Sequence, residues 1–177
     1  VDLASLPAER LSEAALLVPG VLGTGTAQRD RDTLVRRIAA DTGGIHAEAW
    51  AAPTRSGGAE TRLVLRAKAL AVRAEALFSL VGEILGAPVF DAPERLREVV
   101  QAEISRRDSA LLPRAHEVVD RRLRAGLGEA GRREEALNGL TGLDGLRDLT
   151  RSADPAALAG GLEALAGTAM ARPVLVS

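Results

Sequence analysis

Several features that define whole classes of proteins are missing from this 177-residue sequence. It contains no cysteine, which excludes disulfides and thiolate metal sites. No apolar run approaches the ~18 residues that a membrane-spanning helix requires, and the first ten residues lack the basic segment and apolar stretch of a signal peptide. The net charge is −1 and arginines alternate with acidic residues, so the sequence has no basic stripe of the kind that binds nucleic acid.

Aromatic residues and lysine are scarce. Aromatic residues make up 2% of the chain and comprise Trp50, Phe78 and Phe90, so we expect a core of Leu, Val, Ile and Ala. A composition rich in alanine, arginine and glycine with a single lysine is typical of GC-rich bacteria, and we expect a bacterial, cytoplasmic protein. The chain lacks an initial methionine and ends abruptly. We therefore expect a single domain, 1–177, that is a piece of a longer protein.

Two segments alternate with the period of a β-strand. In residues 45–52, the apolar residues Ile45, Ala47, Ala49 and Ala51 share one face, which predicts a strand with one buried face. Residues 61–67 alternate again, and their short connection to the first segment favours an antiparallel pair. Weak alternation in residues 1–6 predicts the tail of a further strand.

Helices are predicted on both sides of this pair. Before it, one helix is expected to begin at Ser5 and to be disturbed at Pro19 and Gly20. A second helix is expected to be capped by Asp30 or Asp32, and Gly43 and Gly44 end it. After the pair, apolar residues at helical spacing predict an amphipathic helix over residues 77–85.

The rest of the sequence predicts further helices and a last strand. Asp91 and Glu94 resemble the capping box of a long helix, which Pro113 is expected to break or kink. Residues 128–131, with two glycines, predict another break. A leucine at every third position between residues 137 and 149 predicts one further helix. Asp154 and Pro155 predict the start of the last helix, and Val174–Val176 predicts the final strand.

Metal ligands and catalytic motifs are few. His46 and Glu48 share one strand face, which two metal ligands could use, but a zinc site needs a third ligand, with His116 or a helical carboxylate as the candidates. His116-Glu117 begins like the helical zinc motif, yet Asp120 stands where the second histidine belongs. The glycines and threonines of residues 20–26 lack the Gly-Lys-Ser/Thr of a phosphate-binding loop, so we interpret them as a helix-ending loop. Two interpretations of the arginine pairs remain open, namely solvated helix faces and a surface for an anionic substrate. These pairs are Arg36-Arg37, Arg106-Arg107, Arg121-Arg122 and Arg132-Arg133.

The order of three segments resembles a half-unit of the insulinase/pitrilysin-type zinc metallopeptidases. These segments are Asp41–Ile45, Leu63–Leu70 and Phe90–Leu96, and the nearest likeness is to the non-catalytic associated domain of the presequence-protease branch. The resemblance covers residues 1–149. It implies an α+β fold, with an antiparallel sheet and helices packed on one face. The helix equivalent to the zinc-binding helix of the active half, Leu11–Gly23, has no histidine, and Glu13 stands alone.

The resemblance implies a functional hypothesis for this chain. We expect a non-catalytic structural domain of a presequence-protease-like zinc metallopeptidase that helps to enclose a peptide, with no catalytic, cofactor or metal residues of its own and with zinc bound elsewhere in the full-length protein. The expected partners are the other domains of the polypeptide and the peptide substrate, not nucleic acid or a membrane. Arg62 and Arg66 are the candidates for residues that line the peptide chamber. The alternative is a freestanding, mostly helical interaction module without protease relatives.

Overall fold

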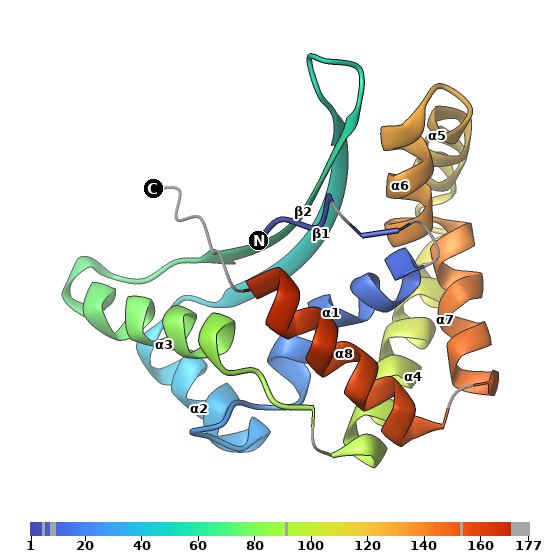
Figure 1. Cartoon of the computed structure of the whole chain (residues 1–177). Helices are drawn as coiled ribbons and strands as arrows, with labels where there is room; N and C mark the ends of the chain where they lie inside the picture. Colours follow the sequence, from blue (N-terminus) through green and yellow to red (C-terminus); the bar gives the residue numbers. More distant parts are fainter. Residues whose placement is uncertain (5, 8–9, 91, 153, 171–177) are drawn as a thin grey trace.

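The computed structural model describes residues 1–4, 6–7, 10–90, 92–152 and 154–170 (Figure 1). The predictions for Ser5, Asp91 and Val174–Val176 lie outside these residues. Within them, the chain has the predicted α+β architecture, with one two-stranded antiparallel sheet among helices. No helix of the described part is long and apolar enough to cross a membrane.

The chain forms a strand hairpin between an N-terminal helix pair and a C-terminal series of helices. The elements follow in the order α1 (Leu11–Gly23), α2 (Arg31–Asp41), β1 (Ile45–Pro53), β2 (Ala59–Ala67), the short 3₁₀ turn η2 (Ala71–Arg73), α3 (Ala74–Gly86), α4 (Pro93–Leu111), α5 (Ala115–Ala125), α6 (Glu129–Asn138), α7 (Leu140–Ser152) and α8 (Pro155–Met170).

The strands β1 and β2 form the predicted hairpin, which projects beyond the helices at its turn (Figure 1). Its register places Ile45 opposite Ala67 and Ala49 opposite Leu63. Ile45, Ala49 and Leu63 are buried on the same face, as the period-two pattern predicted. The N-terminal segment pairs with the outer edge of β2, because the Leu3 amide donates to the Thr61 carbonyl (2.8 Å) and the Leu63 amide donates to the Val1 carbonyl (3.0 Å).

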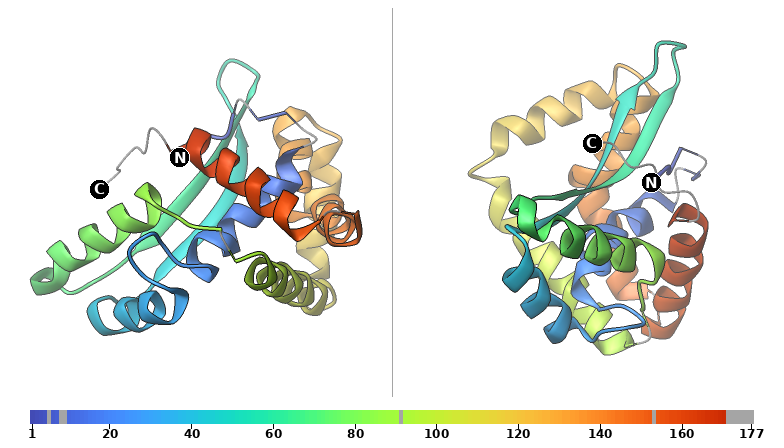
Figure 2. Two further views of the ribbon diagram at one scale, coloured as in Figure 1. Left: turned by 60° about the horizontal axis from the view of Figure 1, so that its bottom comes forward. Right: turned by 90° about the vertical axis from the view of Figure 1, so that its left-hand side faces the viewer.

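Helix α1 is the centre of the core, and β1, α4, α6, α7 and α8 all pack against it. Figure 2 shows α8, in red, lying across α1. The expectation that Pro19 and Gly20 disturb this helix was wrong, since α1 continues through both to Gly23. Proline removes one helical hydrogen bond, but Gly20 lets Phe90 pack directly on the helix. A Cβ at Gly20 would lie 2.8 Å from Phe90 Cε1, and the burial of Phe90 offsets the lost bond.

Helix boundaries follow several of the predicted stop and start signals. The Asp30 carboxylate accepts a hydrogen bond from the Thr33 amide (2.7 Å), so it caps α2. Gly44 has a φ of +117°, which a residue with a side chain rarely adopts, and it connects α2 to β1. Helix α4 ends at Leu111 and α5 begins at Ala115, so Pro113 separates them as predicted.

The leucine-rich segment after residue 128 differs from its prediction. We expected one helix through residues 137–149, whereas α6 ends at Asn138 and α7 begins at Leu140. Gly139 breaks the helix with extended backbone angles, and a Cβ there would lie 1.8 Å from Glu135 Oε2. Gly131 was expected in a break but lies inside α6, where a Cβ would lie 2.0 Å from the Arg124 carbonyl oxygen of α5. Gly131 therefore permits the close approach of α5 and α6, and Gly139 leaves room for the Glu135 carboxylate.

Candidate functional site

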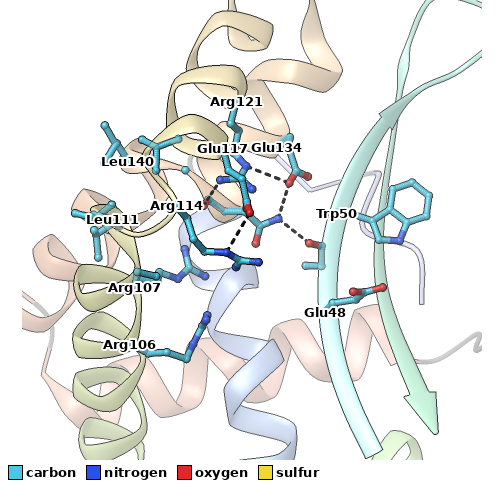
Figure 3. Close-up of a pocket in the computed structure, with 16 residues that line it drawn as sticks. Glu48, Trp50, Arg106, Arg107, Leu111, Arg114, Glu117, Arg121, Glu134 and Leu140 are labelled. Atoms are coloured by element: carbon cyan, nitrogen blue, oxygen red, sulfur yellow. Dashed lines mark hydrogen bonds and ion pairs between the residues drawn. The ribbon is translucent and has the colours of Figure 1, made fainter. Parts of the chain in front are cut away.

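A groove of about 320 Å³ lies between β1 and the region where α4 meets α5 (Figure 3). We call it the β1 groove. One side consists of β1 around Ala49, and the other consists of α4, α5 and the α6–α7 junction. Four arginines contribute to its lining: Arg106, Arg107, Arg114 and Arg121.

Two of these arginines share one buried carboxylate. Glu103 accepts hydrogen bonds from Arg106 (Nη2 to Oε1, 2.6 Å) and from Arg107 (Nε to Oε1, 2.6 Å). Burial alone would raise the pKa of Glu103, but the two guanidinium groups outweigh it and lower that pKa below its ordinary value. The hydrogen bond to Glu103 in turn raises the pKa of Arg106. The trio therefore stays ionised at neutral pH and carries one net positive charge.

The other two arginines form one ion pair each. Arg114 lies 3.1 Å from Glu117, and Arg121 lies 3.6 Å from Glu134. The side chains of Arg106 and Arg114 are 64% and 61% exposed, whereas Arg107 is 11% exposed and also donates to the Leu137 carbonyl (2.8 Å). Arg106 and Arg114 are thus the groove arginines with most freedom to contact a ligand.

The edge of β1 that borders the groove is partly covered by two side chains of α6. Asn138 Nδ2 donates to the Ala49 carbonyl (2.7 Å), and the Ala51 amide donates to Glu134 Oε2 (2.8 Å). Asn138 also donates to Glu134 Oε1 (2.9 Å), so the two side chains form one connected unit. Unpaired backbone groups on a sheet edge invite pairing with another chain. Helix α6 satisfies two of these groups.

Arg62 and Arg66, the predicted chamber residues, lie on β2 outside the β1 groove. Arg62 forms an ion pair with Glu60 and lies opposite Trp50 in the strand register. Arg66 donates to Glu48 (2.6 Å) and its side chain is 71% exposed. Because Glu48 also lines the groove, Arg66 is connected to it through this ion pair.

The predicted metal candidates are not brought together. His46 is exposed on β1, and its neighbour on that face, Glu48, is bound to Arg66. His116 lies on α5 with its side chain 81% exposed. In the described part of the chain, no group of three His, Cys, Asp or Glu residues could hold a metal ion. The described residues therefore do not fit the zinc of the metallopeptidases that the sequence resembles.

The loop after α1 ends that helix, in agreement with the interpretation of residues 20–26. The Thr24 amide donates to the Gly20 carbonyl (3.1 Å). Thr26 donates to the buried Glu83 (2.5 Å), which also binds Arg29. The side chains of this loop therefore serve its packing.

The β1 groove was not predicted from the sequence. The arginine pairs at 106–107 and 121–122 are visible in the sequence, but nothing local assigns them to one surface. The break at Pro113 was the available signal, because a turn between two helices brings side chains from both helices toward the same strand. Which strand lies opposite depends on the packing of α6 against β1, for which the sequence gives no local signal.

Three comparisons relate the chain to known proteins. The sequence model of the family described as "Peptidase M-16C associated" matches residues 1–149. Presequence protease 1, chloroplastic/mitochondrial, of Arabidopsis thaliana is 28% identical over 154 residues, which cover 86% of this chain and 14% of that protein. A conserved protein from Enterococcus faecalis has a similar structure, with a TM-score of 0.57 and 13% identity over 90% of this chain and 38% of that chain. This structural likeness bears on the fold alone.

Proposed function

We propose, from the premise that this chain belongs to the Peptidase M-16C associated family, that it is a non-catalytic domain of a longer zinc metallopeptidase. The chain spans only 14% of the presequence protease that it resembles. The partners of this domain are, on this proposal, the other domains of the same polypeptide. The alternative of an interaction module without protease relatives loses its basis, because the family match covers residues 1–149.

The proposed contribution of the domain is one wall of an enclosed chamber for peptides. The observation that carries this proposal is the β1 groove, in which polar side chains of three helices face a strand edge. Such a surface offers charged groups and backbone groups to an extended peptide. Enclosure restricts a flexible peptide before the chemical step and so reduces the entropy cost of binding it.

The zinc and the hydrolytic step belong, on this proposal, to another part of the full-length protein. Peptide hydrolysis requires a metal-bound water and a general base held close together. His46 and His116 lie on different elements, and Glu48 is occupied by Arg66. The role assigned to this domain is therefore to bind and orient the peptide.

Charge reversal on the outer face of β2 tests the chamber proposal. Arg62→Glu and Arg66→Glu, introduced together into the full-length protein, should weaken peptide affinity and lower turnover several-fold, because they invert the charge of the proposed chamber surface. Peptide affinity and steady-state turnover are the measurements. Arg124→Glu on α5 is the matched control, since Arg124 is an exposed, ion-paired arginine that lies on a helix and not on the hairpin.

A deletion provides the opposite test. If residues 1–170 can be removed from the full-length protein, with the remainder still folded and turnover unchanged, the domain is not a chamber wall. Thermal unfolding of each variant shows whether it is folded. Loss of turnover in the folded double-reversal variant, with the Arg124→Glu control unaffected, supports the proposal.

A further inference from the structure

Helix α3 carries apolar side chains on two opposite sides. Leu80 and Ile84 are buried and face the core of the domain. Phe78 lies about 200° around the helix from Leu80, because each residue turns an α-helix by about 100°, and its side chain is 59% exposed. A surface helix usually carries polar residues on its outer side, whereas a helix that is apolar all round is usually buried. Helix α3 therefore has the composition of a helix that is covered on both sides.

The exposed apolar surface of α3 continues past both ends of the helix. Leu70 and Val72, in the segment that leads into α3, are 76% and 87% exposed. Leu85 lies seven residues after Phe78 and so on the same side of the helix. It lines a groove of about 290 Å³ between α3 and α8, which Ala166 lines from the other side. We call the surface formed by Leu70, Val72, Phe78 and Leu85 the α3 face.

The α3 face differs from the exposed apolar residues of α5 in its lack of charge. Helix α3 contains two glutamates, and Glu83 is buried against Thr26 and Arg29. Glu75 is therefore the one charged side chain that Ala74–Gly86 exposes. Helix α5, in contrast, carries two acidic residues and three arginines around the exposed Val119. Single apolar residues among charges are ordinary on a protein surface, whereas an uncharged apolar patch marks a contact surface.

The position of the α3 face leaves the β1 groove free. Figure 1 shows α3 on the other side of the hairpin from α5 and α6, which border that groove. A partner seated on the α3 face would therefore not cover the groove. A domain that forms part of an enclosure needs one surface fixed to its neighbours and another that remains open, and these two surfaces meet that requirement.

We propose that this domain packs through the α3 face against another domain of the same polypeptide, whose contacting surface is apolar and low in charge. The inference rests on the proposed function, since it names where the non-catalytic domain attaches to the rest of the peptidase. The chain spans 14% of the presequence protease that it resembles, so a full-length protein of that kind supplies further domains on one chain.

The size of the α3 face favours a tethered partner over a second copy of the protein. Helix α3 has 13 residues, and such a helix is about 20 Å long and about 10 Å wide. This surface is small compared with the roughly 800 Å² that each partner contributes to a stable complex of free proteins. A domain on the same chain binds at a high effective concentration and needs less contact area.

The reaction rates of introduced thiols test the contact in the full-length protein. Val72→Cys and Leu127→Cys form a matched pair, because the two side chains are 87% and 86% exposed in this domain. Phe78→Cys and Val119→Cys form a second pair, with exposures of 59% and 57%. In each pair, the thiol on the α3 face should react with a maleimide about tenfold more slowly, because the contact must open before the reagent reaches it. Mass spectrometry of the digested protein measures each rate.

A cross-link identifies what covers the face. A photoreactive phenylalanine derivative is placed at Phe78 of the full-length protein, which is irradiated at low concentration. The expected product has the mass of one chain and joins position 78 to a peptide outside residues 1–177. The same derivative at Val119 is the control and should give no such product. A product with the mass of two chains would mean that a second copy occupies the α3 face, and it would overturn the proposal.

The outcomes separate this inference from the chamber proposal. Equal labelling rates within either pair overturn the α3 contact, and the two pairs are independent if one variant does not fold. That result leaves the chamber proposal to its own turnover measurement with Arg62→Glu and Arg66→Glu. If that double variant keeps full turnover while the α3 face is labelled slowly and cross-links to another domain, the α3 contact stands and the chamber wall does not.

Discussion

The surroundings of α1 and of the β1 groove differ in the kind of contact that they contain, apolar in the first and charged in the second. Helix α1 buries Leu11, Leu16, Leu17 and Val21 almost completely, against helices on several sides. At the groove, by contrast, α5 has no buried residue within the described part of the chain, and α4 and α5 present arginines bound to glutamates. Apolar burial holds the first region together, whereas ion pairs and edge hydrogen bonds hold the second.

This difference assigns the stability of the fold mainly to the core around α1 and the capacity to bind a ligand to the β1 groove. Burial of apolar surface is the larger and less adjustable source of stability, while exposed ion pairs contribute little and rearrange easily. The core around α1 can therefore support a groove whose charged groups remain available to a ligand. Substitutions in the two regions should differ accordingly, both in size and in what they affect.

The largest expected effect is that of Leu17→Ala in α1. Leu17 is fully buried, and the cavity left by a leucine-to-alanine change in a core costs about 2–5 kcal/mol. Leu123→Ala in α5 is the matched control, since Leu123 is 69% exposed and should change stability by less than about 0.5 kcal/mol. Urea denaturation of both variants measures the difference. Similar losses for the two would contradict the contrast between the regions.

A smaller effect is expected for Glu103→Gln, which removes the charge shared by Arg106 and Arg107. Loss of these charge-assisted hydrogen bonds should cost about 1–3 kcal/mol near neutral pH. The pKa of Glu103 is lowered from its ordinary value of 4.5, so its stabilising effect is fully present above pH 4.5 and is lost as the pH falls below that value.

The control for this prediction is the pH dependence itself. Urea denaturation at neutral and at mildly acidic pH measures the free energy of unfolding. This free energy should fall with pH in the unaltered protein, and it should fall less in Glu103→Gln. An unchanged pH dependence in Glu103→Gln would mean that this carboxylate does not stabilise the fold through its charge.

A still smaller and more local effect is expected for Asn138→Ala at the covered part of the β1 edge. The variant leaves the Ala49 carbonyl without its donor, and one such hydrogen bond contributes about 1 kcal/mol. Faster amide exchange should be confined to β1 and the end of α6, and hydrogen–deuterium exchange measures it. Asn138→Asp is an informative second variant, because it keeps the shape but replaces the donor with an acceptor. Unaltered exchange in both variants would show that Asn138 does not protect this edge.

The same contrast explains what the sequence could predict. The hairpin, the α2 cap at Asp30 and the break at Pro113 depend on local patterns and were predicted correctly. The continuation of α1 through Pro19 depends on the packing of Phe90 against Gly20, which are far apart in the chain. Gly139, where the leucine-rich segment divides, leaves room for the Glu135 carboxylate. That carboxylate is bound by Arg122 of α5, a contact between helices that the local pattern does not reveal. The groove was missed for the same reason, since it exists only through contacts between α6 and β1.

The smallest expected effect is that of breaking the ion pair between Arg66 and Glu48, and it sharpens the interpretation of all the binding tests. The Arg66 side chain is largely exposed and that of Glu48 about half exposed, and such surface pairs contribute about 0–1 kcal/mol. A double-mutant cycle with Arg66→Ala and Glu48→Ala, measured by urea denaturation at low and high salt, should give a coupling energy in this range that decreases with salt. A larger, salt-independent coupling would place this pair among the structural elements of the fold. With a small coupling, any loss of peptide binding in Arg66→Glu reflects the surface charge of the hairpin, because the fold itself does not depend on the pair.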